Sequence, residues 1–444
     1  MLKRKLYREL LAWKQSDRRK PLILRGARQV GKSTLIREFG KEYDHFIELN
    51  LEKVEDSRLF NLGSLKEIIE VLFVQNRIPQ GHGQVLIFID EIQESTAAIR
   101  QLRFFYEDFP EIHVICAGSL LEHVIRQIPS FPVGRIQQLL LHPFDFEEFL
   151  WAKGNERMIS LFREIPVGKQ YDDLFFKAFH EYAVIGGMPE VVSVYIKNGT
   201  FTGLHGIYDE IWQTYKDDIE KYGKNDSEKK VLRHIIETAA HEPDRITFAG
   251  FGHSNYRSRE VGEALRSLHK ARLVQLVYPT ISVQLPQVVD FRRKPRLQFL
   301  DTGLLNYILG IQSEMIGIQD LSDFYRGRII QHIVYQEIQA QIHSLDDDLH
   351  FWVREKTNTD AKVDLVVAHR KLLIPVEVKS GNEGRLRSLH QFMDQAVHGY
   401  SIRLLGNHLS IQEAKTTSGK NYKLLNLPYY LASQVAGYAN WFVK

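Results

Sequence analysis

A glycine-rich run near the start of the chain has the spacing of a phosphate-binding loop. The run matches GxxxxGK[ST] and comprises Gly26, Ala27, Arg28, Gln29, Val30, Gly31, Lys32 and Ser33, followed by Thr34. Glycines allow backbone conformations that turn several N–H groups toward phosphate oxygens, and a following helix N-terminus adds positive potential. In such a loop the lysine reaches the β- and γ-phosphates, and the serine holds Mg²⁺. The alternative is an incidental glycine-rich turn.

Two adjacent carboxylates follow a short apolar run further along the chain. Asp90 and Glu91 come directly after residues 85–89, which are all apolar. Ligands of parallel sheets bind beyond the carboxyl ends of the strands. There Asp90 would orient Mg²⁺ through its water shell, and Glu91 would polarise an attacking water molecule. A strand that ends in a solvated acidic turn is the alternative, but the phosphate-loop pattern favours the functional interpretation. The sequence therefore predicts ATP and Mg²⁺ as cofactors.

The elements around these residues alternate between strands and helices. Short apolar runs predict strands at 22–24, 46–51, 85–89, 113–117 and 137–141. Periodic apolar residues predict helices over 32–39, 65–75, 96–109 and 120–127. Alternation of this kind is typical of a parallel sheet that helices cover on both faces. The fold class predicted for this part of the chain is therefore α/β.

These residues resemble the AAA-type branch of the P-loop ATPases. The resemblance implies a polar sensor residue after the strand at 113–117, and Ser119 has that position. A helix N-cap is the compatible alternative for Ser119. Arg135 is the arginine expected to stabilise transition-state charge, in cis or from a neighbouring subunit. The alternative for Arg135 is a surface arginine that pairs with a carboxylate.

Further motifs resemble a widespread prokaryotic ATPase family, in which an AAA-like module precedes a C-terminal region of uncharacterised function. They are Val133-Gly134-Arg135, Leu141-His142-Pro143-Phe144, Phe146-Glu147-Glu148-Phe149-Leu150, Gly186-Gly187-Met188-Pro189-Glu190 and Phe299-Leu300-Asp301-Thr302-Gly303-Leu304. The resemblance spans residues 20–385 approximately. With the change in patterning after Phe149, it divides the chain into four parts. We expect an AAA-type P-loop module at 1–150, a helical lid at 151–225, a winged-helix-like domain at 226–310 and a restriction-endonuclease-like α/β domain at 311–444.

The segment 226–300 has the element order of a winged helix-turn-helix, with three helices followed by a strand pair. The third helix would run over 258–270, and its basic residues Arg259, Arg266 and Lys270 share one helix face. Arg292 and Arg293, with Lys294 and Arg296, lie at the expected tip of the strand pair. A basic helix face beside a basic wing is a way to grip DNA phosphates. The alternative is a rigid spacer whose basic residues are merely solvated.

The C-terminal part contains the pattern D-x12-E-x-K, formed by Asp364, Glu377 and Lys379. It resembles the core of restriction-endonuclease-like nucleases, which implies a second Mg²⁺ held by the two acidic residues and a water positioned by the lysine. Alternation along the strand places Glu377 and Lys379 on the same face. Members of the ATPase family often carry a glutamate four residues after a glycine of the preceding helix, and this chain has Gln331 there. The alternatives are an ordinary half-exposed strand and a retained fold that does not cut.

Composition limits the remaining classes of protein. The net charge is only +3, so a nucleic-acid partner has to be argued from local clusters. Cys116 is the only cysteine, which excludes an intrachain disulfide. The longest apolar runs are much shorter than a membrane span, and basic residues interrupt the N-terminal apolar residues. We therefore expect a cytoplasmic protein without a membrane partner.

Three functional hypotheses follow. The first is a Mg²⁺-dependent AAA-type ATPase that acts on DNA. The second is a DNA nuclease that ATP gates, and the third is a nucleotide-dependent signalling or scaffold switch that binds a protein partner or a second copy of itself.

Overall fold

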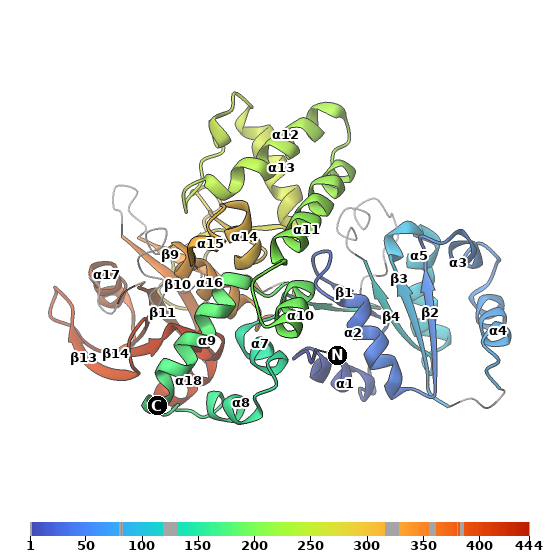
Figure 1. The fold of residues 1–444 in the computed structure, drawn as a ribbon, viewed down its shortest axis with the longest axis horizontal. Helices are drawn as coiled ribbons and strands as arrows, with labels where there is room; N and C mark the ends of the chain where they lie inside the picture. Colours follow the sequence, from blue (N-terminus) through green and yellow to red (C-terminus); the bar gives the residue numbers. More distant parts are fainter. Residues whose placement is uncertain are drawn as a thin grey trace.

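The computed structural model describes residues 2–79, 81, 83–118, 132, 134–315, 328–345, 347–354, 361–379, 381 and 386–443. A sheet with its helices lies at the right of Figure 1, and a second sheet lies at the left. Helices α11, α12 and α13 rise between them at the top of the view. Within the described ranges, no helix is long and apolar enough to cross a membrane.

The first sheet has five parallel strands in the order β2-β3-β4-β1-β5. The strands are β1 (Leu22–Arg25), β2 (His45–Asn50), β3 (Val85–Asp90), β4 (His113–Ala117) and β5 (Gln137–Leu140). The predicted strands and their parallel arrangement are confirmed. Because parallel strands share one carboxyl edge, the segment after β1 and the end of β3 meet on the same side of the sheet.

Alternating side chains of each strand supply two separate cores. On β3, Leu86 and Phe88 pack with α1 and α2, whereas Ile87 and Ile89 pack with α4 and α5. The helices of this part are α1 (Tyr7–Lys14), α2 (Lys32–Phe39), α3 (Val54–Leu59), α4 (Leu65–Gln75) and α5 (Thr96–Asp108). The helix predicted over 120–127 lies outside the described residues.

The next region is helical, as expected from the sequence. Its helices are α7 (Phe146–Ala152), α8 (Glu156–Phe162), α9 (Asp172–Ile185), α10 (Pro189–Asn198) and α11 (Leu204–Ile219). Gly186 and Gly187 separate α9 from α10. A Cβ on Gly187 would lie 2.1 Å from the carbonyl oxygen of Phe144, so only glycine fits there. The backbone N–H of Phe144 donates to the Gly187 carbonyl at 2.7 Å, which fixes this break against the start of α7.

The segment that follows differs in part from the expected three helices. It contains α12 (Asp226–Thr238), α13 (Ser258–Lys270), the antiparallel strands β6 (Val274–Val277) and β8 (Arg296–Phe299), α14 (Thr302–Ile308) and α15 (Gln312–Met315). The helix at 258–270 and the strand pair are confirmed. The prediction of a helix between α12 and α13 is wrong. Pro243, Gly250 and Gly252 interrupt this segment, which forms only two 3-10 turns.

The second sheet is mixed and has seven strands in the order β13-β14-β12-β11-β10-β9-β7. Its strands are β7 (Pro279–Thr280), β9 (His350–Val353), β10 (Lys362–His369), β11 (Leu372–Val378), β12 (Tyr400–Leu405), β13 (Ser410–Lys415) and β14 (Asn421–Pro428). The helices of this part are α16 (Arg328–Gln339), α17 (Arg387–Gln395) and α18 (Val435–Phe442). The edge strand β7 comes from the segment expected to form the winged helix, so the two parts share a sheet.

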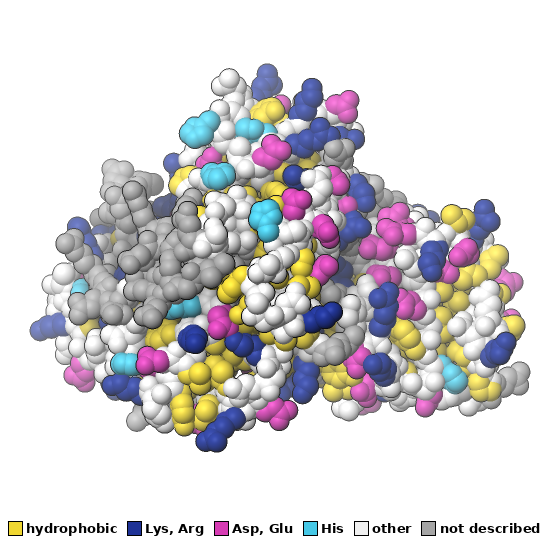
Figure 2. Space-filling model, in the orientation of Figure 1, with side chains coloured by type: hydrophobic (Ala, Val, Ile, Leu, Met, Phe, Trp, Pro, Cys, Tyr) yellow, Lys and Arg dark blue, Asp and Glu magenta, His cyan; other side chains and the backbone are white. Residues whose placement is uncertain are grey.

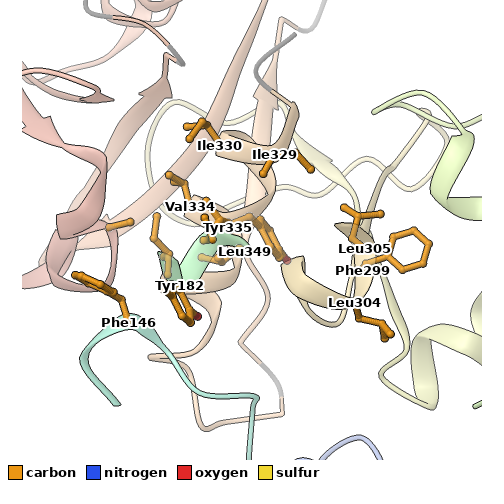
Figure 3. Close-up of a cluster of buried hydrophobic side chains, with 14 of the residues drawn as sticks. Phe146, Tyr182, Phe299, Leu304, Leu305, Ile329, Ile330, Val334, Tyr335 and Leu349 are labelled. Carbon is orange, nitrogen blue, oxygen red and sulfur yellow. The ribbon is translucent and has the colours of Figure 1, made fainter. Parts of the chain in front are cut away.

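Helix α16 joins the helical region to the second sheet. Figure 3 shows Val334 and Tyr335 of this helix between Phe146 and Tyr182 on one side and Phe299 on the other. All of these side chains belong to one buried apolar cluster. Since this cluster continues into the second sheet, the helical region and one face of that sheet share a core that is separate from both cores of the first sheet. The other face of the second sheet packs with α17 in a further cluster.

Candidate functional site

The glycine-rich run forms the turn between β1 and α2. Gly26 has φ 148° and Gly31 has φ 90°, both in the region that favours glycine. A Cβ on Gly26 would lie 2.4 Å from the carbonyl oxygen of Leu141, which follows the neighbouring strand β5. The loop therefore lies at the carboxyl edge of the sheet, directly before a helix N-terminus, as a phosphate site requires. Thr34 is exposed on the first turn of α2.

Three side chains of the site meet in front of this loop. The ammonium of Lys32 donates to the carbonyl oxygens of Gly26 and Ala27, at 3.0 and 2.8 Å. The Ser33 hydroxyl donates to Oδ2 of Asp90 at 2.6 Å. Ser33 is on α2 and Asp90 ends β3, so the tertiary fold has joined the two motifs that the sequence singled out.

The electrostatics of the loop follow from burial. Burial lowers the pKa of Lys32 to about 8, although the charges of Glu91 and Asp90 act in the opposite direction. Burial likewise raises the pKa of Asp90, and the hydrogen bond from Ser33 offsets part of that effect. A polyanionic ligand would strongly stabilise the charged form of this buried lysine. The pair formed by Ser33 and Asp90 has the oxygen ligands that suit Mg²⁺.

Glu91 follows Asp90 in a left-handed backbone conformation, with φ 49°. Non-glycine residues adopt this conformation rarely, and such positions cluster at functional sites. The amide of Gln93 donates to the Glu91 carboxylate, which restricts its orientation. The candidate general base therefore lies at the carboxyl edge beside Asp90, as the sequence predicts.

Helix α11 contacts the outer side of the phosphate loop, which the sequence did not reveal. Nη1 of Arg28 lies 2.6 Å from both carboxylate oxygens of Asp218, a residue that is 5% exposed. The hydroxyl of Tyr215, one turn earlier on α11, donates to the backbone carbonyl of Arg28 at 2.7 Å. Arg28 thus faces α11 and ties the loop to the helical region.

A second support for the loop comes from the N-terminal segment. Arg4 is buried, and its guanidinium donates to the carbonyl oxygen of Val30 at 2.9 Å and to that of His142 at 2.6 Å. It also forms an ion pair with Glu148 at 3.1 Å. The N-terminal basic residues gave no sign of this role, because the contacts span 26 to 144 residues of sequence.

Two further residues were predicted to act on the nucleotide, Ser119 as a sensor and Arg135 as a charge-stabilising arginine. Ser119 lies outside the described residues. Arg135 precedes β5, so it lies near the amino edge of the parallel sheet, opposite the phosphate loop. Its guanidinium pairs with Glu107 of α5. In this arrangement Arg135 does not face the phosphate loop of its own chain, so a role in catalysis would require a neighbouring copy.

The acidic residues of the C-terminal pattern lie side by side on neighbouring strands. Leu365 of β10 pairs with Val376 of β11, so Asp364 and Glu377 are opposite each other. Lys379 pairs with Glu377, as the same-face spacing predicts. Among the residues that the structure describes, no three His, Cys, Asp or Glu side chains are grouped closely enough to hold a metal ion.

The basic residues predicted to contact DNA are placed unequally. Arg259 and Arg292 are exposed, with side-chain accessibilities of 87% and 92%. Arg266 and Lys270 line a groove between α12 and α13 that Glu260 and Glu263 also line. Arg293 turns inward, pairing with Asp290 and donating to the carbonyl oxygen of Arg354.

The surface around these residues has mixed charge. Figure 2 shows Lys and Arg side chains at the top of the molecule, over α12 and α13, with Asp and Glu side chains among them. Arg296, expected at the same wing tip, is instead buried within β8. The exposed basic surface is therefore smaller than the sequence indicated.

Three family models match successive parts of the chain. An AAA domain matches residues 18–150, the domain of unknown function DUF8612 matches 176–315, and the domain of unknown function DUF4143 matches 326–430. Among solved structures, a Walker-type ATPase of Pyrococcus abyssi is similar, with a TM-score of 0.46 and 16% identity, over 70% of this chain and 96% of that chain.

Two curated relatives are similar in sequence, and both are uncharacterised proteins. The one from Haemophilus influenzae is 25% identical over 221 residues, which are 48% of this chain and 49% of the relative. The one from Methanocaldococcus jannaschii is 24% identical over 199 residues, which are 42% of this chain and 39% of the relative. The matches therefore span half or less of these relatives. The AAA-domain match covers the phosphate loop and the β3 carboxylates, so residues 18–150 form an AAA-type P-loop ATPase module, and two domains of unknown function follow it.

Proposed function

We propose that this protein hydrolyses ATP with Mg²⁺ and couples the turnover to DNA. The observation that carries the ATPase part is the meeting of Lys32, Ser33 and Asp90 in front of the glycine-rich loop. Backbone N–H groups of the loop and the α2 N-terminus would bind the phosphates. Lys32 would exchange its two backbone carbonyl partners for phosphate oxygens.

Ser33 and Asp90 are the residues that would hold Mg²⁺, and the ion would supply charge neutralisation at the phosphates. The fit rests on the Asp90 carboxylate, which the Ser33 hydroxyl contacts at 2.6 Å and whose pKa burial raises, so a nearby cation would stabilise its charged form. Glu91 would orient the attacking water and accept its proton. Gln93 would hold the Glu91 carboxylate in position through its amide.

The proposed coupling to DNA rests on the exposed basic residues of the middle segment. Arg259 and Arg292 extend into solvent, and Arg266 and Lys270 lie on the same face of α13 as Arg259. Phosphate contacts by such residues make affinity fall steeply with salt. The Glu side chains among them reduce the local positive potential, so we expect weak binding without strong sequence preference.

A nucleotide-dependent switch that binds a protein partner is the second candidate. The contacts of Arg28 with Asp218, and of Tyr215 with the Arg28 carbonyl, favour it. A change in the loop on nucleotide binding would reach α11 directly, and α11 leads into α12. This function requires no DNA and only slow hydrolysis.

The test is steady-state ATP hydrolysis with and without duplex DNA. Glu91→Gln is expected to lower kcat by about 10²–10⁴-fold, as for the loss of a general base. Glu94→Gln, an exposed acidic residue of the following turn, is the matched control and should leave kcat unchanged. Turnover that survives Glu91→Gln would contradict the assigned role.

The DNA part is tested by the salt dependence of binding. Arg259→Ala combined with Arg266→Ala should weaken duplex binding. The slope of log affinity against log salt should become shallower by about 1 for each DNA phosphate that an arginine no longer neutralises. Arg8→Ala, an exposed arginine of α1, is the control that changes charge elsewhere. ATPase activity indifferent to DNA, with no salt-dependent binding, would select the switch.

A further inference from the structure

The acidic pair of the C-terminal part already has a cationic partner, which comes from the preceding segment. Nη2 of Arg296, the first residue of β8, lies 2.9 Å from Oδ1 of Asp364, and Nη1 donates to the Asp364 carbonyl oxygen at 2.8 Å. The other carboxylate oxygen of Asp364 accepts the backbone N–H of Val378 at 2.9 Å. Both oxygens of this carboxylate are therefore occupied.

Arg296 is held in place from several directions. It is 4% exposed, and its guanidinium lies 4.6 Å from the ring centroid of Phe351 on β9. It also forms an ion pair with Asp244 at 3.1 Å, and Asp244 in turn pairs with Lys362 of β10. Because a buried arginine keeps its charge, its removal from Asp364 would leave charges without partners on both sides.

Among the described residues, the charged groups that pair with one another at this site have equal numbers of each sign, and burial together with the charge of Asp364 raises the pKa of Glu377 to about 7. Three carboxylates, those of Asp244, Asp364 and Glu377, meet three cations, those of Arg296, Lys362 and Lys379. A divalent cation added here would leave two positive charges uncompensated in a largely buried region. The nearby side chain from α16 is Gln331, a neutral residue whose amide nitrogen lies 3.5 Å from Oδ1 of Asp364. These side chains do not fit a Mg²⁺ site.

We propose that the Arg296 guanidinium occupies the place of the divalent cation at this acidic pair, so that Asp364 binds the preceding segment instead of a metal. The site is then a clamp between two parts of the chain and does not cleave phosphodiesters. Other contacts reinforce the same junction: β7 pairs with β9, and the backbone N–H of Phe299 donates to the His332 ring at 3.0 Å.

The clamp has a consequence for nucleotide-driven motion. Residues 279–299 and the second sheet are joined by a strand pairing, a buried ion pair and ring contacts. They are expected to move as one body. Motion driven by ATP would then occur where the phosphate loop meets α11, and not between the basic surface of α13 and the C-terminal sheet.

The first experiment measures Mn²⁺ binding to the nucleotide-free full chain by electron paramagnetic resonance. The wild type, Asp364→Asn and Glu377→Gln should bind the same number of Mn²⁺ ions. The same proteins should leave supercoiled plasmid DNA intact in Mg²⁺ or Mn²⁺. Loss of one bound Mn²⁺ in Asp364→Asn, or metal-dependent cleavage by the wild type that this variant abolishes, would overturn the proposal.

The second experiment measures the clamp itself. Arg296→Met should lower the Tm by about 5 °C or more, because it leaves a buried carboxylate unpaired. Adding Asp364→Asn to that variant should recover part of the loss. Arg292→Met, which removes an exposed arginine from the same segment, should leave the Tm unchanged. Equal Tm values for the Arg296 and Arg292 variants would refute the clamp. If Arg296→Met does not fold, the Mn²⁺ experiment still tests the proposal, because it does not use that variant.

Discussion

The lowered pKa of Lys32 makes ATP affinity depend on pH in a range that can be measured. Without nucleotide, burial lowers this pKa to about 8. Bound phosphates would return it toward the usual value of about 10.4, because they stabilise the charged form. ATP therefore binds the protonated lysine, and binding takes up a proton once the pH exceeds about 8.

The magnitude follows from the fraction of protonated Lys32. With a pKa of about 8, roughly nine tenths of the free protein is protonated at about pH 7 and roughly one tenth at about pH 9. The affinity should fall about tenfold between these pH values, or about 1.4 kcal/mol. Titration calorimetry with a nonhydrolysable ATP analogue and Mg²⁺ measures this change.

The variant Glu91→Gln tests the cause. Of the neighbouring carboxylates, Glu91 raises the Lys32 pKa most, so its neutralisation should shift the loss of affinity to lower pH. Glu94→Gln should leave the profile unchanged. Affinity that stays constant between about pH 7 and 9, or a shift to higher pH in Glu91→Gln, would refute the reasoning.

A loss of folded protein at high pH would not explain the fall in ATP affinity, because the contribution of Lys32 to stability rises with pH whereas its contribution to affinity falls. The folded pKa of Lys32 is below its unfolded value of about 10.4. Between about pH 8 and 10.4 the unfolded chain binds more protons than the native state, so the contribution of Lys32 to stability rises with pH. The Tm of the nucleotide-free protein at each pH provides the control.

Three further predictions concern the surroundings of the site. Asp218→Asn removes the buried partner of the loop arginine and should cost about 1.5–3 kcal/mol. A lower Tm and faster amide exchange in residues 26–33 would show it, and Asp217→Asn on the exposed face of α11 should change neither. Gly187→Ala should prevent native folding, judged by soluble yield and Tm, because its Cβ would lie 2.1 Å from a carbonyl oxygen. Gly206→Ala has open space within α11 and should add about 0.5–1 kcal/mol of stability. Burial raises the pKa of Glu337 to about 8, so the native state holds a proton that the unfolded state releases above about pH 4.3, and stability falls as pH rises through that window. Glu337→Gln should therefore raise the Tm more near pH 7.5 than near pH 5, and an equal change at both would contradict it.

Much of the ATPase module could be predicted because its signals are local. The phosphate loop is one continuous run, and its glycines, lysine and serine are fixed by a single turn between a strand and a helix. The strand before Asp90 is uniformly apolar because helices cover both faces of its sheet. Parallel strands then bring the two motifs to one edge. Asp90 could be expected near Ser33, 57 residues away, because both follow strands of one parallel sheet.

The middle segment could be predicted only in part. The order of elements indicated a helix over 258–270 and a strand pair after it, which are α13 and the strands β6 and β8. The prediction of a helix directly before α13 was wrong, because a proline and two glycines interrupt that segment. The basic run at 292–296 did not indicate that one of its arginines would be exposed and another buried. Arg292 extends into solvent, whereas Arg296 points into the protein from the first position of a strand.

The sequence by itself predicted the nucleotide chemistry, since each of its two motifs is a continuous run directly after an apolar strand. Tertiary structure alone decided what each motif touches. Arg28 meets Asp218 across 190 residues, and Arg296 meets Asp364 across 68. Contacts over such separations depend on how helices and sheets pack, and no local pattern encodes that packing. The same Asp-Glu-Lys spacing could serve a metal or an arginine, and the burial of one side chain from another segment decides between them.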